Sequence, residues 1–304
     1  KESALFVPSG TMGNLISVLS HCQRGDEVIL GDRSHIFLHE VGGMSALGGV
    51  HPRILPNNKD GTLPLTLVES SIRPEDIHSP STRLICLENT HNFCQGSPLS
   101  PEYMGSVGDL AAKYGLKIHL DGARLFNAAV ALDLDVKALT QRVDSVMFCL
   151  SKGLSAPVGS MVCGERDFIQ RARKFRKMVG GGMRQAGHLA AAGLVALENL
   201  VERLNDDHMN ARFLAEQLAS FEGIKLDQTS VKTNIIFFQL NHPQIVANKF
   251  LSSLEAKSIK ILMTDPGIFR AVLHREITRE QVEVVAQTIQ SVLFNGRSNT
   301  MDDK

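Results

Sequence analysis

Short, unbroken apolar runs separated by longer amphipathic stretches restrict the fold of this sequence more than any other feature. Two clear examples are Leu84–Leu87 and Val146–Leu150. A strand with one face in water alternates apolar and polar residues, whereas a strand covered on both faces is apolar throughout. The runs therefore predict an α/β fold with a mostly parallel central sheet and helices on both faces.

The expected elements alternate along residues 1–221. Strands are expected at 27–30, 52–55, 83–88, 117–120, 145–150 and 160–163. Helices are expected at 12–22, 38–47, 65–72, 101–114, 166–179, 185–204 and 208–221.

From about Lys225 the pattern changes to that of a smaller α+β domain. Strands are expected at 234–240 and 269–273, and helices at 243–257 and 278–294. Thr278, with Gln281 three residues later, has the spacing of a capping box. We therefore expect a large domain over 1–205 and a small C-terminal domain over 206–304, with a tail over 295–304 that frays.

Charge and composition argue against several classes of protein. Thirty-two Lys and Arg balance 32 Asp and Glu among 304 residues, which does not favour a general nucleic-acid binder. The basic run from Arg171 to Lys177 is expected to be a solvated helix face, since only two Tyr and no Trp are available to stack on bases. No apolar run reaches the roughly 18 residues of a membrane span.

Cysteine usage and the first residue bear on the compartment. Five cysteines without a CxxC motif favour reduced thiols and a cytoplasmic protein. The chain begins with Lys1 rather than Met, so we expect an N-terminal segment to be missing. A mitochondrial address therefore stays open.

Two residues that could take part in catalysis follow predicted strands. Asp121 closes one apolar strand, and Lys152 comes just after another. The carboxyl ends of parallel strands share one sheet edge, where ligands bind. Each residue alone also has an ordinary interpretation, as a loop acid and as a surface lysine. Together they fit pyridoxal phosphate, because an acid can hold the pyridine nitrogen protonated while a desolvated lysine amine bonds the aldehyde carbon.

The phosphate of such a cofactor needs backbone N–H donors at a helix N-terminus. Ser9, Gly10 and Thr11 precede the first predicted helix and offer small side chains and hydroxyl groups. The same three residues would also make an ordinary helix N-cap, so this signal is weak by itself.

Six segments in this order resemble the threonine aldolase family: SGTMGN, SHIF, ENTHN, HLDGARLFNA, FCLSKGLSAPVGS and GGGMRQAG. The resemblance extends from about residue 4 to about residue 275. It implies the aspartate-aminotransferase-like fold (fold type I), pyridoxal 5'-phosphate as cofactor, and retro-aldol cleavage of L-threonine or L-allo-threonine to glycine and acetaldehyde. Family members normally begin further upstream, so an N-terminal arm is expected to be missing here.

The resemblance assigns cofactor roles residue by residue. Lys152 is the Schiff-base lysine, and Asp121 pairs with the pyridine nitrogen. Gly10 and Thr11 bind the phosphate. His35 stacks on the cofactor ring and is counted with the catalytic residues. No metal site is implied.

The resemblance also assigns substrate and subunit roles. Arg124 reaches the phenolic oxygen of the cofactor and the substrate carboxylate, which Arg270 binds as well. His78 lies near the substrate hydroxyl and is the expected catalytic base. Arg184 completes a cofactor phosphate site across a subunit boundary, which implies a homo-oligomer, a tetramer of catalytic dimers. His39 stands where the family usually has an aromatic residue, so the preferred substrate side chain stays open.

Two alternatives remain at this point. Another fold-type-I lyase or an aminotransferase would share Asp121, Lys152 and the phosphate turn. An inactive, truncated member of the family would share the fold without the activity.

Overall fold

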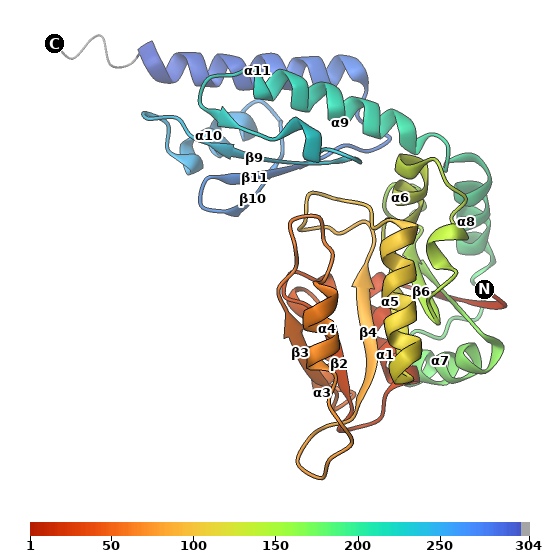
Figure 1. The fold of residues 1–304 in the computed structure, drawn as a ribbon. Helices are drawn as coiled ribbons and strands as arrows, with labels where there is room; N and C mark the ends of the chain where they lie inside the picture. The colour runs from red at the N-terminus through yellow and green to blue at the C-terminus, as the bar shows by residue number, and fades with distance from the viewer. Residues whose placement is uncertain (299–304) are drawn as a thin grey trace. The chain divides into compact units, whose positions relative to one another are not determined.

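A seven-stranded sheet lies at the centre of the N-terminal unit, residues 1–202. The strand order is β1 (Ser3–Val7), β7 (Ser160–Gly164), β6 (Ser145–Cys149), β5 (Lys117–Asp121), β4 (Thr82–Glu88), β2 (Glu27–Gly31) and β3 (His51–Leu55). The five strands from β6 to β3 are parallel, while β7 runs antiparallel between β6 and β1. The predicted mostly parallel sheet is thereby confirmed in the computed structural model, which describes residues 1–298 (Figure 1).

Helices cover both faces of this sheet, and the strands send alternate side chains to each face. In β4, Ile85 and Leu87 join one apolar cluster, whereas Leu84 and Cys86 join another on the opposite face. All four side chains are at most 4% exposed, which explains why this strand is apolar throughout. One face carries α4 (Leu65–Ser71), α5 (Pro101–Tyr114) and α6 (Leu125–Leu132), and the other carries α1 (Gly10–His21) and α7 (Arg166–Met178).

The single helix predicted over 38–47 is wrong. Two one-turn helices, α2 (His35–Leu38) and α3 (Gly43–Ala46), occupy this region. Between them Val41 and Gly42 have positive φ angles of 54° and 63°, a conformation that cannot continue a right-handed helix. The break leaves Glu40 buried beside the carboxyl edge of the sheet.

Three other elements of the N-terminal unit differ from the sequence analysis. Strand β1 and helix α6 were not expected, because their short apolar segments carry no clear periodicity. Helix α8 (Gly187–Asn199) is shorter than the range predicted for it.

The C-terminal unit, from residue 203 onward, contains a four-stranded antiparallel sheet. Rings of Phe238, Phe250 and Phe269 contact one another in its core. The strand order is β10 (Leu262–Asp265), β11 (Ile268–Val272), β9 (Ile235–Leu240) and β8 (Ile224–Lys225), with helices α9 (Leu204–Ala219), α10 (Ala247–Glu255) and α11 (Arg279–Ser298). Short strands β8 and β10 were not predicted.

The predicted capping box is confirmed at the start of α11. The backbone N–H of Thr278 donates to Gln281 Oε1 at 2.9 Å, and the N–H of Gln281 donates to Thr278 Oγ1 at 3.3 Å. Helix α11 extends to Ser298, and the rest of the tail that was expected to fray, 299–304, lies outside the described residues. None of the helices within 1–298 is both long enough and apolar enough to cross a lipid bilayer.

Candidate active site

The carboxyl ends of β4, β5 and β6 bring the predicted chemistry to one edge of the sheet. Glu88 pairs with Asp121 in the β4–β5 ladder, and Asp121 pairs with Met147 in the β5–β6 ladder. Lys152 lies in the turn three residues beyond the end of β6 and is half-buried. The edge therefore carries two buried acids and the predicted Schiff-base lysine.

Asp121 is only 1% exposed, and both of its carboxylate oxygens accept hydrogen bonds. Oδ2 accepts a hydrogen bond from Asn14 Nδ2 at 2.8 Å, and Oδ1 accepts one from the N–H of Ala123 at 3.0 Å. Burial raises the pKa of Asp121, as does the nearby Glu88 charge, while the positive charges of Lys152 and His35 oppose this rise. A carboxylate in this setting gains stability from a further cationic N–H donor.

His35 is fixed beside this acid at the start of α2. Its backbone N–H donates to Glu88 Oε2 at 2.7 Å, and its ring Nδ1 lies 2.9 Å from Glu40 Oε1. One ligand atom each from His35, Glu40 and Asp121 fall within 4.8 Å of one another. The hydrogen bond to Glu40 raises the pKa of His35, which favours the charged imidazolium.

The predicted phosphate turn lies between β1 and α1. The Ser9 hydroxyl caps α1 by accepting from the N–H of Met12 at 3.2 Å, so Gly10 and Thr11 occupy the first turn, where backbone N–H groups have no intrahelical partner. A Cβ at position 10 would lie 3.1 Å from Cys149 Sγ. The turn therefore rests directly on the end of β6, the strand that leads to Lys152.

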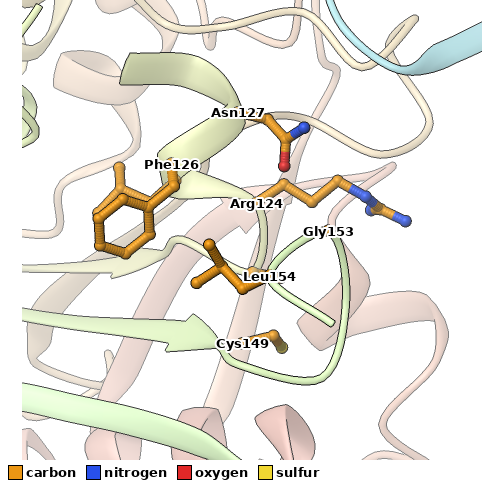
Figure 2. Close-up of a pocket in the computed structure, with 8 residues that line it drawn as sticks. Arg124, Phe126, Asn127, Cys149, Gly153 and Leu154 are labelled. Carbon is orange, nitrogen blue, oxygen red and sulfur yellow. The ribbon is translucent and has the colours of Figure 1, made fainter. Parts of the chain in front are cut away.

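Arg124 comes from the loop that follows β5, and Figure 2 shows this loop beside the loop that follows β6. A small crevice between the loops is lined by Arg124, Asn127, Cys149 and Gly153, among others. Arg124 Nη1 donates to Asn92 Oδ1 at 3.1 Å, and burial lowers the pKa of the guanidinium. A partly desolvated guanidinium favours a carboxylate partner.

His39 lies near His35 at the entrance to this edge. Its ring stacks on Phe93 with centroids 5.0 Å apart and lies 5.6 Å from the ring of His35. Position 39, where the sequence departs from the family pattern, is therefore part of an aromatic group that includes Phe93 from the loop after β4.

Neither His78 nor Arg270 is brought to this edge within the N-terminal unit. His78 is exposed in the loop before β4, at the amino end of the sheet, and about 20 Å of strand separates the two ends of β4. Arg184 is exposed in the bend before α8. Arg270 belongs to the C-terminal unit, on β11 opposite Phe237. The roles assigned to these residues stay predictions.

Sequence reasoning missed the residues that support Asp121. Asn14, Glu40 and His119 are each at most 6% exposed and hydrogen-bonded near the acid. The available signal was polarity in a buried context, because Asn14 interrupts the apolar stripe of its helix and His119 interrupts an apolar strand. A buried polar side chain needs a partner, and such positions therefore indicate a hydrogen-bonded network.

Comparison with known proteins agrees with this geometry. A family model for β-eliminating lyases matches residues 1–241. Low-specificity L-threonine aldolase 1 of Arabidopsis thaliana is 48% identical over 298 residues, which cover 97% of this chain and 83% of the relative. The chain belongs to the β-eliminating lyase family, among the threonine aldolases. The resemblance inferred from the six motifs is thereby confirmed.

Solved structures of other proteins share this fold. A threonine aldolase of Leishmania major superimposes with a TM-score of 0.82 at 20% identity, covering 96% of this chain and 84% of that one. An aspartate aminotransferase of Rhodobacter sphaeroides gives a TM-score of 0.73 at 18% identity, over 97% and 78% of the two chains. The predicted aspartate-aminotransferase-like fold is confirmed.

The described residues fit pyridoxal phosphate. Each Asp121 oxygen accepts one hydrogen bond from the protein and keeps lone-pair capacity for a ring N–H. The first turn of α1 offers amides to a phosphate, and Lys152 lies within electrostatic reach of Asp121. The donor set thus provides an acid for the ring nitrogen, an amine for the aldehyde and amides for the phosphate.

Proposed function

We propose that this chain is a pyridoxal-phosphate-dependent threonine aldolase, which cleaves L-threonine or L-allo-threonine to glycine and acetaldehyde. The observation that carries the proposal is the buried Asp121 carboxylate at the end of β5, with Lys152 and His35 as its opposing charges. The match to threonine aldolases over nearly the whole chain supports the same activity.

Bound pyridoxal phosphate supplies an electron sink for the carbanion that forms when the Cα–Cβ bond of the amino acid breaks. Asp121 keeps the ring nitrogen protonated, so the sink stays strong. Lys152 holds the cofactor through its amine and gives it up to the amino group of the substrate. Gly10 and Thr11 fix the phosphate, and His35 lies against the ring.

Arg124 and Arg270 are proposed to bind the substrate carboxylate. A planar guanidinium makes two parallel, charge-assisted hydrogen bonds to a carboxylate, which fixes the rotation of the substrate about its N–Cα bond. This orientation decides which bond at Cα is cleaved. His39 and Phe93 are proposed to contact the β-substituent, because their stacked rings adjoin His35.

Cleavage also needs a base for the β-hydroxyl proton. His78 is the base that the family resemblance proposes, but in this unit it lies at the other end of the sheet from Asp121. It would therefore act at the site of a second copy of the chain. His35, which is already at the edge, is the proposed base if each chain acts alone, and its ring must first give up the proton that the hydrogen bond to Glu40 favours.

An experiment with mixed oligomers distinguishes between these two candidate bases. Lys152→Ala and His78→Ala variants, each expected to be inactive by itself, are co-purified with different tags. Recovered activity in the mixture supports His78 acting in trans, because one site then keeps both residues. A fully active His78→Ala variant would eliminate His78 and leave His35.

The deciding experiment for the function is a coupled acetaldehyde assay with L-threonine and with L-allo-threonine. Equal amounts of acetaldehyde and glycine are expected. Ammonia with a keto acid would instead indicate a β-eliminating lyase or an aminotransferase, the nearest alternative on this fold. A chain that binds no cofactor and releases no acetaldehyde would be an inactive family member.

Assembly and compartment complete the proposal. Arg184 is proposed to contribute to the cofactor phosphate site of a neighbouring subunit, in a homotetramer of catalytic dimers. The cytoplasm is the proposed compartment, and threonine breakdown with glycine formation is the proposed metabolic role. Light scattering of the cofactor-loaded protein and of an Arg184→Ala variant tests the assembly.

A further inference from the structure

A buried row of polar side chains runs from the active-site edge to the far side of α1. Asn14 Nδ2 lies 2.8 Å from both Asp121 Oδ2 and Glu40 Oε1, and Asn14 Oδ1 lies 3.0 Å from His119 Nε2. His119 Nδ1 lies 2.8 Å from Ser145 Oγ. The catalytic roles proposed above use none of these supporting side chains except Asp121.

The row continues to the end of α1. His21 Nε2 lies 2.7 Å from the same Ser145 hydroxyl, and the His21 ring stacks on Phe168 of α7 at 4.6 Å. Asn14 and His21 are seven residues apart, so both project from one face of α1 toward β5 and β6. Helix α1 thus carries two members of the row, Asn14 and His21.

The geometry of the partners sets the direction of each hydrogen bond. Glu40 Oε1 and Asp121 Oδ2 both lie on the Nδ2 side of the Asn14 amide and accept its two N–H groups. Asn14 Oδ1 therefore faces His119, whose Nε2 must carry a proton to donate to it.

His119 is neutral, so its other ring nitrogen, Nδ1, carries no proton. Complete burial lowers the pKa of His119 to about 3, so at neutral pH the ring carries a single proton, at Nε2. Its Nδ1 then accepts from the Ser145 hydroxyl, and Ser145 Oγ accepts from His21 Nε2–H. Burial lowers the pKa of His21 to about 4, so this ring is neutral as well.

We propose that His119 is a positioning residue, which as its Nε2–H tautomer fixes the Asn14 amide and thereby holds Asp121 ready for the cofactor ring nitrogen. The inference rests on the proposed function only in its last step, since the hydrogen-bond order belongs to the chain itself. Without the His119 donor, Asn14 Oδ1 is left buried and unpaired, so the amide loses one of the three contacts that fix it. An amide that shifts to find another partner weakens its hydrogen bond to Asp121.

The tautomer is tested directly by NMR of protein labelled with ¹⁵N-histidine, without cofactor and with pyridoxal phosphate. The His119 signals are assigned by their loss in His119→Gln. We expect a proton at Nε2 and a bare Nδ1, unchanged from about pH 6 to about pH 8. An imidazolium, or a proton at Nδ1, overturns the proposal. A cation bound by His35, Glu40 and Asp121 would give the latter result, because an amide with its oxygen turned toward the cation would leave His119 to donate from Nδ1.

Two substitutions test the positioning role. His119→Leu removes the donor, whereas His119→Gln keeps a side-chain N–H that can reach Asn14 Oδ1. We expect the dissociation constant for pyridoxal phosphate to rise about tenfold or more in His119→Leu, as when a buried acceptor loses its donor, and to recover to within about threefold of the parent in His119→Gln. Equal effects of the two variants would assign His119 a packing role only and overturn the proposal.

Serine variants provide the matched control. Ser145 and Ser17 are both 0% exposed, but Ser17 Oγ donates to the Gly13 carbonyl and lies outside the row. Ser145→Ala should disturb the His119 nitrogen signals and weaken cofactor binding, while Ser17→Ala should do neither. Parent-like behaviour of Ser145→Ala contradicts the proposal.

The failure of this inference is distinguishable from the failure of the proposed function. If the parent chain binds no pyridoxal phosphate, the function is wrong, yet the cofactor-free NMR spectrum still decides the tautomer. If the parent releases acetaldehyde but His119 carries its proton elsewhere, only this inference is wrong.

Discussion

The Asn14 amide and the Asp121 carboxylate are hydrogen-bonded at 2.8 Å although 107 positions separate them in sequence. Asn14 lies one turn after Gly10 and Thr11 in the same helix, so about 5 Å of α1 links the phosphate turn to the residue that holds the acid. A rigid helix thereby sets the spacing between the groups proposed for the two ends of the cofactor. The site depends on α1 as much as on the sheet.

Replacing Asp121 by Asn should leave the fold intact but reduce catalysis. The amide keeps the size of the acid and loses the charge that holds the ring nitrogen protonated. We expect turnover with L-threonine to fall at least ~100-fold, which corresponds to about 2.7 kcal/mol in the activation barrier. Asp144→Asn, at a carboxylate that pairs with exposed Lys117 before β6, is the control and should keep parent turnover. Parent-like activity of Asp121→Asn would refute the role of the acid.

Replacing Lys152 by Arg should prevent covalent attachment of the cofactor. A guanidinium keeps the positive charge but does not form a Schiff base at neutral pH. Borohydride reduction followed by peptide mass spectrometry should find one phosphopyridoxyl group, on Lys152 of the parent and on no peptide of the variant. Lys174→Arg, at an exposed lysine of α7, should label like the parent. A reduced adduct on another lysine would show that the assignment is wrong.

Replacing Arg124 by Lys should weaken substrate binding more than cofactor binding. An ammonium cannot make the two parallel hydrogen bonds of a guanidinium, so we expect the KM for L-threonine to rise by roughly tenfold or more. Arg142→Lys is the control, because Arg142 forms an ion pair with Asp109 on the surface. An unchanged KM in Arg124→Lys would remove Arg124 from the carboxylate site.

The sequence predicted those parts of the fold and site that depend on local pattern. Continuous apolar strands gave the parallel sheet, because burial on both faces leaves no position for polar residues. Asp121 and Lys152 were found because each directly follows such a strand. The carboxyl edge then brings them together without any knowledge of side-chain contacts.

Contacts between distant segments could not be predicted in the same way. Glu40 falls within the single helix predicted over 38–47, but the left-handed Val41 and Gly42 interrupt that helix, and Glu40 is buried against His35 and Asn14. His119 is one polar residue in an apolar strand, and its partners come from α1 and β6. Only tertiary structure shows which polar residues meet.

A methyl group added at Gly13 should destabilise the N-terminal unit. A Cβ there would lie 2.6 Å from Met147 Cγ, so α1 would have to move away from β6. We expect Gly13→Ala to cost about 1–3 kcal/mol, as overpacking usually does, and to weaken cofactor binding, because the phosphate turn moves with α1. Gly105→Ala in α5 is the matched control.

A Cβ at Gly105 has nothing within 4 Å, so Gly105→Ala should stabilise the protein by about 0.5–1 kcal/mol through helix propensity. Thermal unfolding followed by circular dichroism suits both variants, since the chain has no Trp for fluorescence. Equal melting temperatures for the two variants would contradict the close packing of α1 on β6.

Acid should destabilise the cofactor-free protein partly through the buried histidines of the Asn14 row. Burial lowers the folded-state pKa of His119 to about 3 and that of His21 to about 4, whereas an unfolded histidine titrates near 6.5. Between those values the unfolded state binds more protons, so stability is fully present above about pH 6.5 and falls as the pH is lowered. Each such histidine contributes a loss of up to about 1.4 kcal/mol per pH unit.

Comparing the parent with His119→Gln isolates this contribution. Asp121 and Glu40 act in the opposite direction, because burial raises their folded-state pKa and the native protein takes up their protons first. Their effect is common to both proteins and cancels in the difference. The melting temperature of His119→Gln should therefore fall less than that of the parent between about pH 6.5 and about pH 5, while His188→Gln, at an exposed position in α8, should follow the parent. Parallel curves for all three proteins would mean that His119 takes up its proton without unfolding, and so is not held neutral by the fold.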